Sequence, residues 1–387
     1  MADRNGFSWI SSEGARRAKS AVAVALSFVI LLGGAGLVVW KGYSVYMSWR
    51  QREDYIGAGG SQVQIYIPPG SSNPRIADIL VAADVIKDPS VFDDECAKMG
   101  DAAAIWAGTY NLKTHLPAKT ALDMLLDRDA NRVTIRWTVP EGTRLSQIED
   151  LMINELGVTR EEVDQARAAI TADPAGNSLS AYANPAQPEG YFFPDTYMSE
   201  PHDALGAFRQ MTGQFNNVAG EINLDAAAAN VSAGLGITIT PQQLVVVASI
   251  IEGEVNRSEY RPMVARSIYN RLLVGQALGV ESAFRYGREI ATGTPYDDEI
   301  QVADQHNPDL PYNFYMKSAL PDTPIANPGR DALQAAANPT PGPWRWWITQ
   351  NLFTGETEFY ETEEAFNEGK LRFDQWCVDN GHPTGCS

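Results

Sequence analysis

Residues 240–255 read TPQQLVVVASIIEGEV, and this stretch decides where the core of the fold lies. Thr240 is a favourable N-cap, Pro241 suits the first helical position, and Gln243 completes a capping box. Every residue from 244 to 251 is apolar or small, and a helix that is apolar on all sides is buried. We therefore predict a central helix that begins after Thr240 and runs through the core.

Glu252 stands at the end of this apolar run and extends its face. Because burial disfavours an ionised carboxyl group, enclosure would raise the pKa of Glu252 into the range that suits a general acid. Glu254 lies about 200° further around the helix, so the two glutamates do not share a face. As an alternative, Glu252 forms an ion pair with an arginine of the next helix, predicted over 261–276.

The composition excludes several classes of function. The chain has 387 residues and a formal charge of −18, which argues against binding to a nucleic-acid backbone. Three cysteines cannot build a zinc ribbon, and four scattered histidines argue against a histidine-rich metal site. We therefore expect no nucleic-acid partner, no metal and no cofactor. The length suggests two or three compact units.

The segment SAVAVALSFVILLGGAGLVVW, residues 20–40, carries no charge and is long enough to cross a membrane. We interpret it as an uncleaved transmembrane anchor; a signal peptide and a buried helix are the alternatives. The basic residues around the span weakly favour a cytoplasmic tail over 1–19, so the predicted localisation is a single-pass cell-membrane protein with its body outside the cytoplasm.

An extracytoplasmic body would allow disulfide bonds. Cys377 and Cys386 are close in sequence near the C-terminus and could form a local disulfide. Alternatively, one of them could pair with Cys96.

Two segments share one design. VQIYIPPGSSNPRIADIL, residues 63–80, and VTIRWTVPEGTRLSQIEDLM, residues 133–152, each predict a strand, a Pro-Gly turn and a helix, with Gly70 aligned to Gly142. They suggest two small α/β units after a linker over 41–62. The alternative is a chance match, because strand–turn–helix segments are common.

Other segments predict further elements. A strand is expected over 105–112 and an amphipathic helix over 119–127. PEGYFFPDTY, residues 188–197, predicts a rigid loop whose aromatic side chains either pack in the core or face a substrate. Residues 344–350 and 357–362 predict a closing hairpin, whose tryptophans either pack or stack on a sugar.

The order of motifs resembles the endolytic murein transglycosylases of the YceG-like (MltG) family, in an actinobacterial form. The motifs are AGTY (107–110), VPEGT (139–143), EGYFFPDTY (189–197), ASIIEGEV (248–255), YNRL (269–272), LPYNFY (310–315) and PIANPGRDAL (324–333). The resemblance implies an α+β fold: a single N-terminal transmembrane helix, a small LysM-like α/β module over 63–132, and a larger mixed α+β catalytic domain over 133–366. A C-terminal tail over 367–387 follows.

The resemblance also implies a reaction. The family cleaves the MurNAc–GlcNAc bond of nascent peptidoglycan strands without water and leaves 1,6-anhydro-MurNAc ends. Its catalytic glutamate falls on Glu252, which acts as general acid and then as base. One carboxylate suffices, because the muramic C6 hydroxyl attacks within the same sugar. The implied partners are peptidoglycan strands, the membrane and cell-wall synthases.

The polar and aromatic residues of these motifs and of the neighbouring segment 277–287 are the expected substrate-binding residues. They are Glu254, Asn270, Glu281, Tyr286, Tyr312, Asn313, Tyr315 and Asn327.

One segment departs from the family pattern. Where the family usually has LQTD-P, this chain has LGVES, residues 278–282, within a predicted loop over 277–287. This departure leaves two alternatives to the lytic enzyme. One is a non-catalytic or weakened peptidoglycan-binding scaffold. The other is a water-using muramidase, for which Glu281 would be the second carboxylate.

Overall fold

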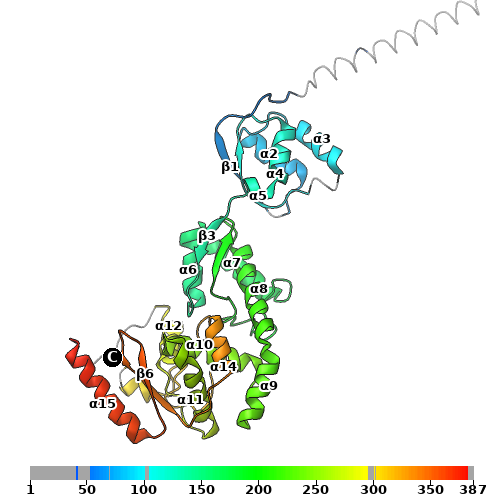
Figure 1. The fold of residues 1–387 in the computed structure, drawn as a ribbon. Helices are drawn as coiled ribbons and strands as arrows, with labels where there is room; N and C mark the ends of the chain where they lie inside the picture. Colours follow the sequence, from blue (N-terminus) through cyan, green and yellow to red (C-terminus); the bar gives the residue numbers. More distant parts are fainter. Residues whose placement is uncertain are drawn as a thin grey trace, which may run out of the picture. The chain divides into compact units, whose positions relative to one another are not determined.

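The structure is a computed structural model that describes residues 41, 53–68, 70–100, 104–294, 300 and 302–381. The tail predicted over 1–19 and the span predicted over 20–40 lie outside these residues. Within the described part of the chain, no helix is long and apolar enough to cross a membrane. The chain divides into two compact units, unit 1 up to Arg132 and unit 2 from Val133 (Figure 1).

Unit 1 is built around an antiparallel pair of strands, β1 (Gln62–Ile67) and β2 (Gly108–Lys113). Its helices are α2 (Asn73–Ala82), α3 (Pro89–Met99), α4 (Ala118–Leu126) and α5 (Arg128–Asn131). Ile65, Ile67 and Tyr110 on the strands are buried in one apolar cluster with side chains of α2, α3 and α4. The strand and the helix predicted between the half-repeats are therefore both present.

The end of the predicted linker is bound to unit 1. Asp54 accepts hydrogen bonds from the backbone N–H of Ala118, at 3.0 and 3.1 Å, at the first residue of α4. The hydroxyl of Tyr55 donates to Asp84 at 2.8 Å. Asp54 thus supplies the N-terminal cap that Pro117, the residue before α4, cannot provide.

Unit 2 holds two antiparallel strand pairs within the described residues, β3 (Ile135–Thr138) with β4 (Thr196–Ser199) and β5 (Trp346–Asn351) with β6 (Glu356–Tyr360). Its helices are α6 (Leu145–Leu156), α7 (Arg160–Ala172), α8 (Ala204–Ile222), α9 (Leu224–Leu235), α10 (Pro241–Glu254), the short η2 (Ser258–Tyr260), α11 (Arg261–Leu273), α12 (Glu281–Thr292), α13 (Val302–Gln305), α14 (Arg330–Ala337) and α15 (Glu363–Asp379).

Both half-repeats adopt the predicted strand, turn and helix. Gly70 and Gly142 have φ angles of 75° and 76°, in the left-handed region that favours glycine, and Ile76 and Ile148 are buried. The second copy, however, is not a small unit of its own. Strand β3 pairs with β4, and α6 packs into the large core of unit 2, so the second copy is built into unit 2.

Helix α10 is the central helix that the sequence predicts. The Thr240 hydroxyl accepts from the backbone N–H of Gln243 at 3.2 Å, and the Gln243 side chain accepts from the backbone N–H of Thr240 at 2.9 Å. All side chains from Leu244 to Ile251 are buried. The capping box and the apolar run are therefore both confirmed.

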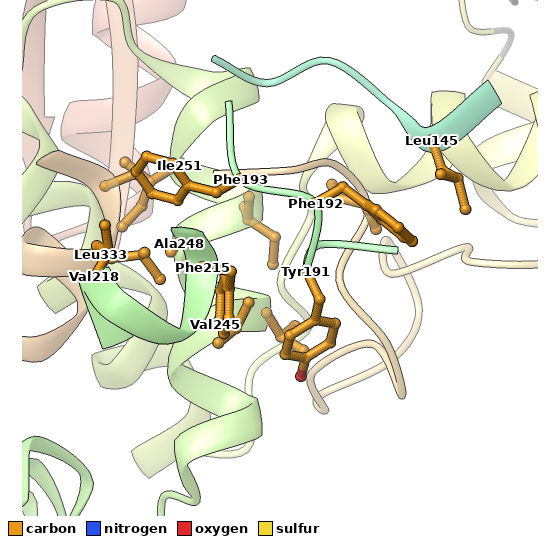
Figure 2. Packing of buried hydrophobic residues seen from close by; sticks show 14 of the residues in the cluster. Leu145, Tyr191, Phe192, Phe193, Phe215, Val218, Val245, Ala248, Ile251 and Leu333 are labelled. Carbon is orange, nitrogen blue, oxygen red and sulfur yellow. The ribbon is translucent and has the colours of Figure 1, made fainter. Parts of the chain in front are cut away.

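The aromatic loop over 188–197 packs in the core. Tyr191, Phe192 and Phe193 are buried, which favours packing over a substrate-facing wall. Figure 2 shows these three side chains gathered with Phe215 and Val218 of α8, Val245, Ala248 and Ile251 of α10, and Leu333 of α14.

The prediction of a loop over 277–287 is wrong, because α12 begins at Glu281. Two features hide this helix in the sequence. The residue before it, Val280, gives no side-chain cap, and Gly287 lies in its interior. A side chain at position 287 would collide with the backbone of Pro311, so glycine is needed there for close approach of the two segments.

The predicted closing hairpin is present as β5 and β6, and Trp346 is buried in it. The boundary predicted after residue 366 falls inside α15. Cys377 on this helix is disulfide-bonded, whereas Cys96 is a free, buried thiol. The pairing that uses Cys96 is therefore excluded, and Cys386 lies outside the described residues.

Candidate active site

The Glu252 side chain lies in the last turn of α10 and is only 4% exposed. The turn between β3 and α6 packs on it, since a side-chain carbon at position 142 would lie 3.6 Å from the Cβ of Glu252. The N-terminus of α14 faces the same carboxylate through the backbone N–H of Gly329. Glu252 is thus enclosed by α10, a turn from the second half-repeat and the start of α14.

Arg261, the first residue of α11, is the cationic partner of Glu252. Its Nη1 lies 3.0 Å from Oε1 of Glu252, and its Nη2 donates a hydrogen bond to Oε2 at 3.3 Å. The side chain of Arg261 is 8% exposed. The ion pair with an arginine of the next helix, which the sequence left open, is therefore present.

Burial raises the pKa of Glu252 to about 7. The negative charges of Glu141 and Asp331 act in the same direction, whereas Arg261 and the backbone N–H of Gly329 lower the pKa. At neutral pH the Glu252 carboxyl group is consequently divided between its protonated and ionised forms. Such a group can both donate and accept a proton.

Glu141 is a site residue that the sequence reasoning missed. Its Oε2 lies 3.6 Å from Nη1 of Arg261, and its side chain is 48% exposed. The available signal is the VPEGT motif, which indicates a turn and the family resemblance but gives Glu141 no role. No periodicity in the sequence links this turn to α10, so only the fold brings Glu141 and Glu252 to one arginine.

Asn327 ties together the loops that surround Glu252. Its side chain accepts from the backbone N–H of Phe192 and donates to the carbonyl of Thr143 and to Oε1 of Glu189, each at 2.9 Å. It is fully buried. The sequence predicts that Asn327 binds substrate. In the structure its side chain hydrogen-bonds to three protein groups instead, which favours a positioning role.

Glu189 completes this buried network. Its two oxygens accept from the backbone N–H of Leu145, at 3.0 and 3.1 Å, at the start of α6. Burial raises the pKa of Glu189 to about 7, while the hydrogen bonds lower it. The carboxylate therefore caps a helix to which it is not adjacent in sequence.

Glu254 and Asn270, predicted to bind substrate, make contacts of a different kind. Glu254 accepts from the Ser282 hydroxyl at 2.8 Å and from Nε1 of Trp347 at 3.3 Å, so it connects α10, α12 and β5. Asn270 is buried and donates to backbone carbonyls of the segment that leads into β5. Both residues hold the hairpin against the core.

Glu281, the predicted second carboxylate, is 53% exposed and pairs with Arg285 of its own helix at 2.7 Å. The altered segment 278–282 meets Glu254 through Ser282. The carboxylate that shares a partner with Glu252 is Glu141 rather than Glu281.

The remaining predicted residues gather around α12 and the 310–315 loop. The rings of Tyr286 and Tyr312 meet edge to face at 5.0 Å, and Tyr315 packs on Phe284 at 6.0 Å. Asn313 is fully buried and donates to three backbone carbonyls. Tyr312 and Tyr315 therefore support α12, whereas Asn313 holds the segment before the loop.

A pocket of about 530 Å³ is lined by residues of α14 and of the start of α11. Asp331 lines it, and this side chain also acts on the pKa of Glu252. The pocket includes Pro262 and Arg330, the residues that directly follow Arg261 and Gly329. Within the described residues, no group of three or more His, Cys, Asp or Glu side chains could hold a metal ion.

Comparison with known proteins gives consistent matches. The profile of the YceG-like family matches residues 65–371. A Bacillus subtilis protein named endolytic murein transglycosylase is 27% identical over 323 residues, which cover 80% of this chain and 84% of the relative.

A Streptococcus pneumoniae protein of the same name is 26% identical over 302 residues, covering 72% of this chain and 52% of the relative. This chain therefore spans about half the length of the pneumococcal relative. A crystal structure of a yceG-like protein from Listeria monocytogenes aligns with a TM-score of 0.49 at 24% identity, covering 80% of this chain and 99% of that chain.

Replacing Asn327 by alanine should lower the free energy of unfolding by about 2 to 4 kcal/mol, because buried partners lose their hydrogen bonds. Chemical unfolding followed by tryptophan fluorescence measures this change. Asn216→Ala removes an exposed asparagine that donates to the Ser178 carbonyl, and it should cost less than about 0.5 kcal/mol. Equal stabilities of the two variants would contradict the positioning role.

The free energy of unfolding of the natural chain should fall relative to that of Glu252→Gln as the pH rises from about 5 to 8. The pKa of Glu252 is raised from 4.5 to about 7 on folding, so between these values the folded chain keeps a proton that the unfolded chain releases. The natural chain therefore loses up to about 3 kcal/mol over this window, and the variant does not lose this share. Urea unfolding across the pH range tests this, and a pH-independent difference would refute it.

Proposed function

The chain belongs to the YceG-like family, and we propose that it is a membrane-anchored lytic transglycosylase in which Glu252 is the general acid and base. The family and the names of the relatives support peptidoglycan transglycosylase activity. The observation that carries the role of Glu252 is its enclosed carboxyl group, whose pKa burial raises to about 7.

The proposed reaction cleaves the MurNAc–GlcNAc bond in two proton transfers. Protonated Glu252 donates its proton to the glycosidic oxygen as the bond from that oxygen to C1 of MurNAc breaks. The C6 hydroxyl of the same MurNAc then attacks C1, and its proton returns to Glu252. The products are a GlcNAc end and a 1,6-anhydro-MurNAc end, and no water is consumed.

The intramolecular attack explains how one carboxylate can suffice. A hydrolase must position a water or supply a nucleophilic carboxylate, whereas the C6 hydroxyl is already part of the substrate. Effective molarities for well-oriented intramolecular attack reach about 10⁵ M or more.

We extend the proposal to the setting of the enzyme. The uncharged segment 20–40 supports a single membrane anchor, and the basic residues around it weakly favour a cytoplasmic N-terminus. The two compact units would then lie outside the cytoplasm, where nascent glycan strands are made. Cell-wall synthases are the partners that such a location would offer.

We also place part of the glycan strand in the pocket that Asp331 lines. Gln334 and Asn338 contribute uncharged amide groups, which can both donate to and accept from sugar hydroxyl and acetamido groups. Ile222 and Ala335 add an apolar wall. A volume of about 530 Å³ is within the usual range for small-ligand pockets.

The full chain, purified in detergent, should cut uncrosslinked glycan strands and leave anhydro ends that mass spectrometry detects as one water lighter than reducing ends. Glu252→Gln should abolish this cleavage but keep strand binding, because the amide cannot supply the proton. Glu155→Gln, an exposed glutamate on α6, is the charge-matched control and should cleave normally. Reducing ends would indicate a muramidase, and binding without any cleavage by the natural chain would indicate a scaffold.

Gln334→Ala should raise KM about 3- to 10-fold while kcat changes less than about twofold, because a binding hydrogen bond is lost away from the reacting atoms. Steady-state kinetics on strands of defined length measure both constants. Gln165→Ala, an exposed glutamine on α7, should leave both unchanged. An unchanged KM in Gln334→Ala would remove the pocket from the substrate path.

A further inference from the structure

The ion pair between Glu252 and Arg261 poses a problem for a general acid. A carboxylate beside a guanidinium at 3.0 Å is normally held ionised, because the opposite charge favours the charged form. Glu252 must carry a proton to begin the reaction proposed above. Burial opposes the effect of Arg261, and any contact that weakens the ion pair acts in the same direction as burial.

The contacts of Arg261 show an incomplete pair. Bidentate arginine–carboxylate pairs form two parallel hydrogen bonds. Here only the bond from Nη2 to Oε2 of Glu252 forms, at 3.3 Å. Among the described residues, the buried Oε1 of Glu252 and the buried Nε of Arg261 have no hydrogen-bond partner.

Glu141 approaches the same nitrogen of Arg261 as Glu252 does. Nη1 lies 3.0 Å from Oε1 of Glu252 and 3.6 Å from Oε2 of Glu141. One positive charge is therefore shared between two carboxylates. The charged groups that face Glu252 are Arg261 on α11, Glu141 on the β3–α6 turn and Asp331 on α14.

The turn that carries Glu141 is held in place by its surroundings. Gly142 has a positive φ angle, and its backbone N–H donates to the carbonyl of Asn327 at 2.9 Å, so the turn is tied to the loop before α14. The Glu141 carboxylate then lies in the space that a side chain at position 329 would fill. Gly329 has a φ angle of −76°, so glycine is needed there for space rather than for backbone conformation.

We propose that Glu141 is a positioning residue that shares Nη1 of Arg261 with Glu252 and so leaves Glu252 able to keep its proton. This inference rests on the proposed role of Glu252 as general acid. Glu141 acts through Arg261 and through its own negative charge, and both effects favour the protonated form of Glu252. Gly329 is the residue that gives Glu141 its place.

Two variants disturb Glu141 in different ways. Glu141→Gln removes the charge and keeps the shape. Gly329→Ala keeps the charge but displaces the Glu141 carboxylate, and the new methyl group meets only the end of this flexible side chain. Both variants should make Glu252 release its proton at a lower pH than in the natural chain.

The test is the pH profile of kcat/KM for anhydro-end formation by the full chain. The alkaline limb reports the general acid of the free enzyme. Removal of the Glu141 charge in one variant and its displacement in the other should each move this limb down by about one pH unit. Activity at pH 8 should then fall about tenfold, while activity at pH 5 should change less than about twofold. Glu155→Gln is the control for net charge.

A second measurement does not depend on activity. Carbon-13 NMR of labelled glutamate carboxyl groups in the full chain, with Glu252→Gln to assign the signal, should show Glu252 titrating at lower pH in Glu141→Gln and Gly329→Ala. An unmoved titration in both variants would overturn the positioning role. A loss of kcat at all pH values with an unmoved limb would also overturn it, because Glu141 would then act on the substrate directly.

The two proposals fail in distinguishable ways. If the natural chain forms no anhydro ends, the proposed function fails, whatever the NMR titrations show. If the natural chain is active and both variants keep its pH profile and its Glu252 titration, only the role of Glu141 fails.

Discussion

The buried amide of Asn327 is the contact on which the site depends. Its three side-chain hydrogen bonds reach the β3–α6 turn, the aromatic loop after Glu189 and the Glu189 carboxylate. The turn and the aromatic loop, which also carries Glu189, come from two different regions of the sequence. Because an amide offers both donors and an acceptor, one asparagine can satisfy all of them. The turn that carries Glu141 and the helix start that carries Gly329 are thereby held against α10.

This arrangement gives Glu252 two opposing influences. The apolar face of α10 removes the carboxyl group from water, which favours its protonated form, and Arg261 favours its ionised form. Neither influence alone would give a group that both donates and accepts a proton near neutral pH. A fully buried carboxyl without Arg261 would hold its proton too tightly, and a complete ion pair would exclude the proton. Burial raises the pKa of Glu252 to about 7, against the opposing effect of the incomplete pair with Arg261.

Local signals in the sequence predicted the local structure. The capping box at Thr240, the apolar run of α10 and the glycine turns of the half-repeats depend on neighbouring residues, and all are present. The sequence does not predict helix α12, because its start has no side-chain cap and because its interior Gly287 is needed for close packing against Pro311, which is distant in sequence. Asn327 and Glu141 show a larger limit of prediction from sequence. A sequence marks a polar residue as noteworthy but does not reveal whether protein or substrate occupies its side chain.

The charges around Glu252 fit the proposed two-step reaction. With Glu252 protonated, Glu141 and Arg261 balance each other, and this group of three residues carries no net charge. Once the proton moves to the leaving oxygen, the group carries one negative charge at the moment when positive charge develops at C1 of MurNAc. The proton of the C6 hydroxyl then restores the neutral state. Glu141 contacts Arg261 in this arrangement and is not required to activate a water molecule. Its presence near Glu252 is therefore compatible with a reaction that consumes no water.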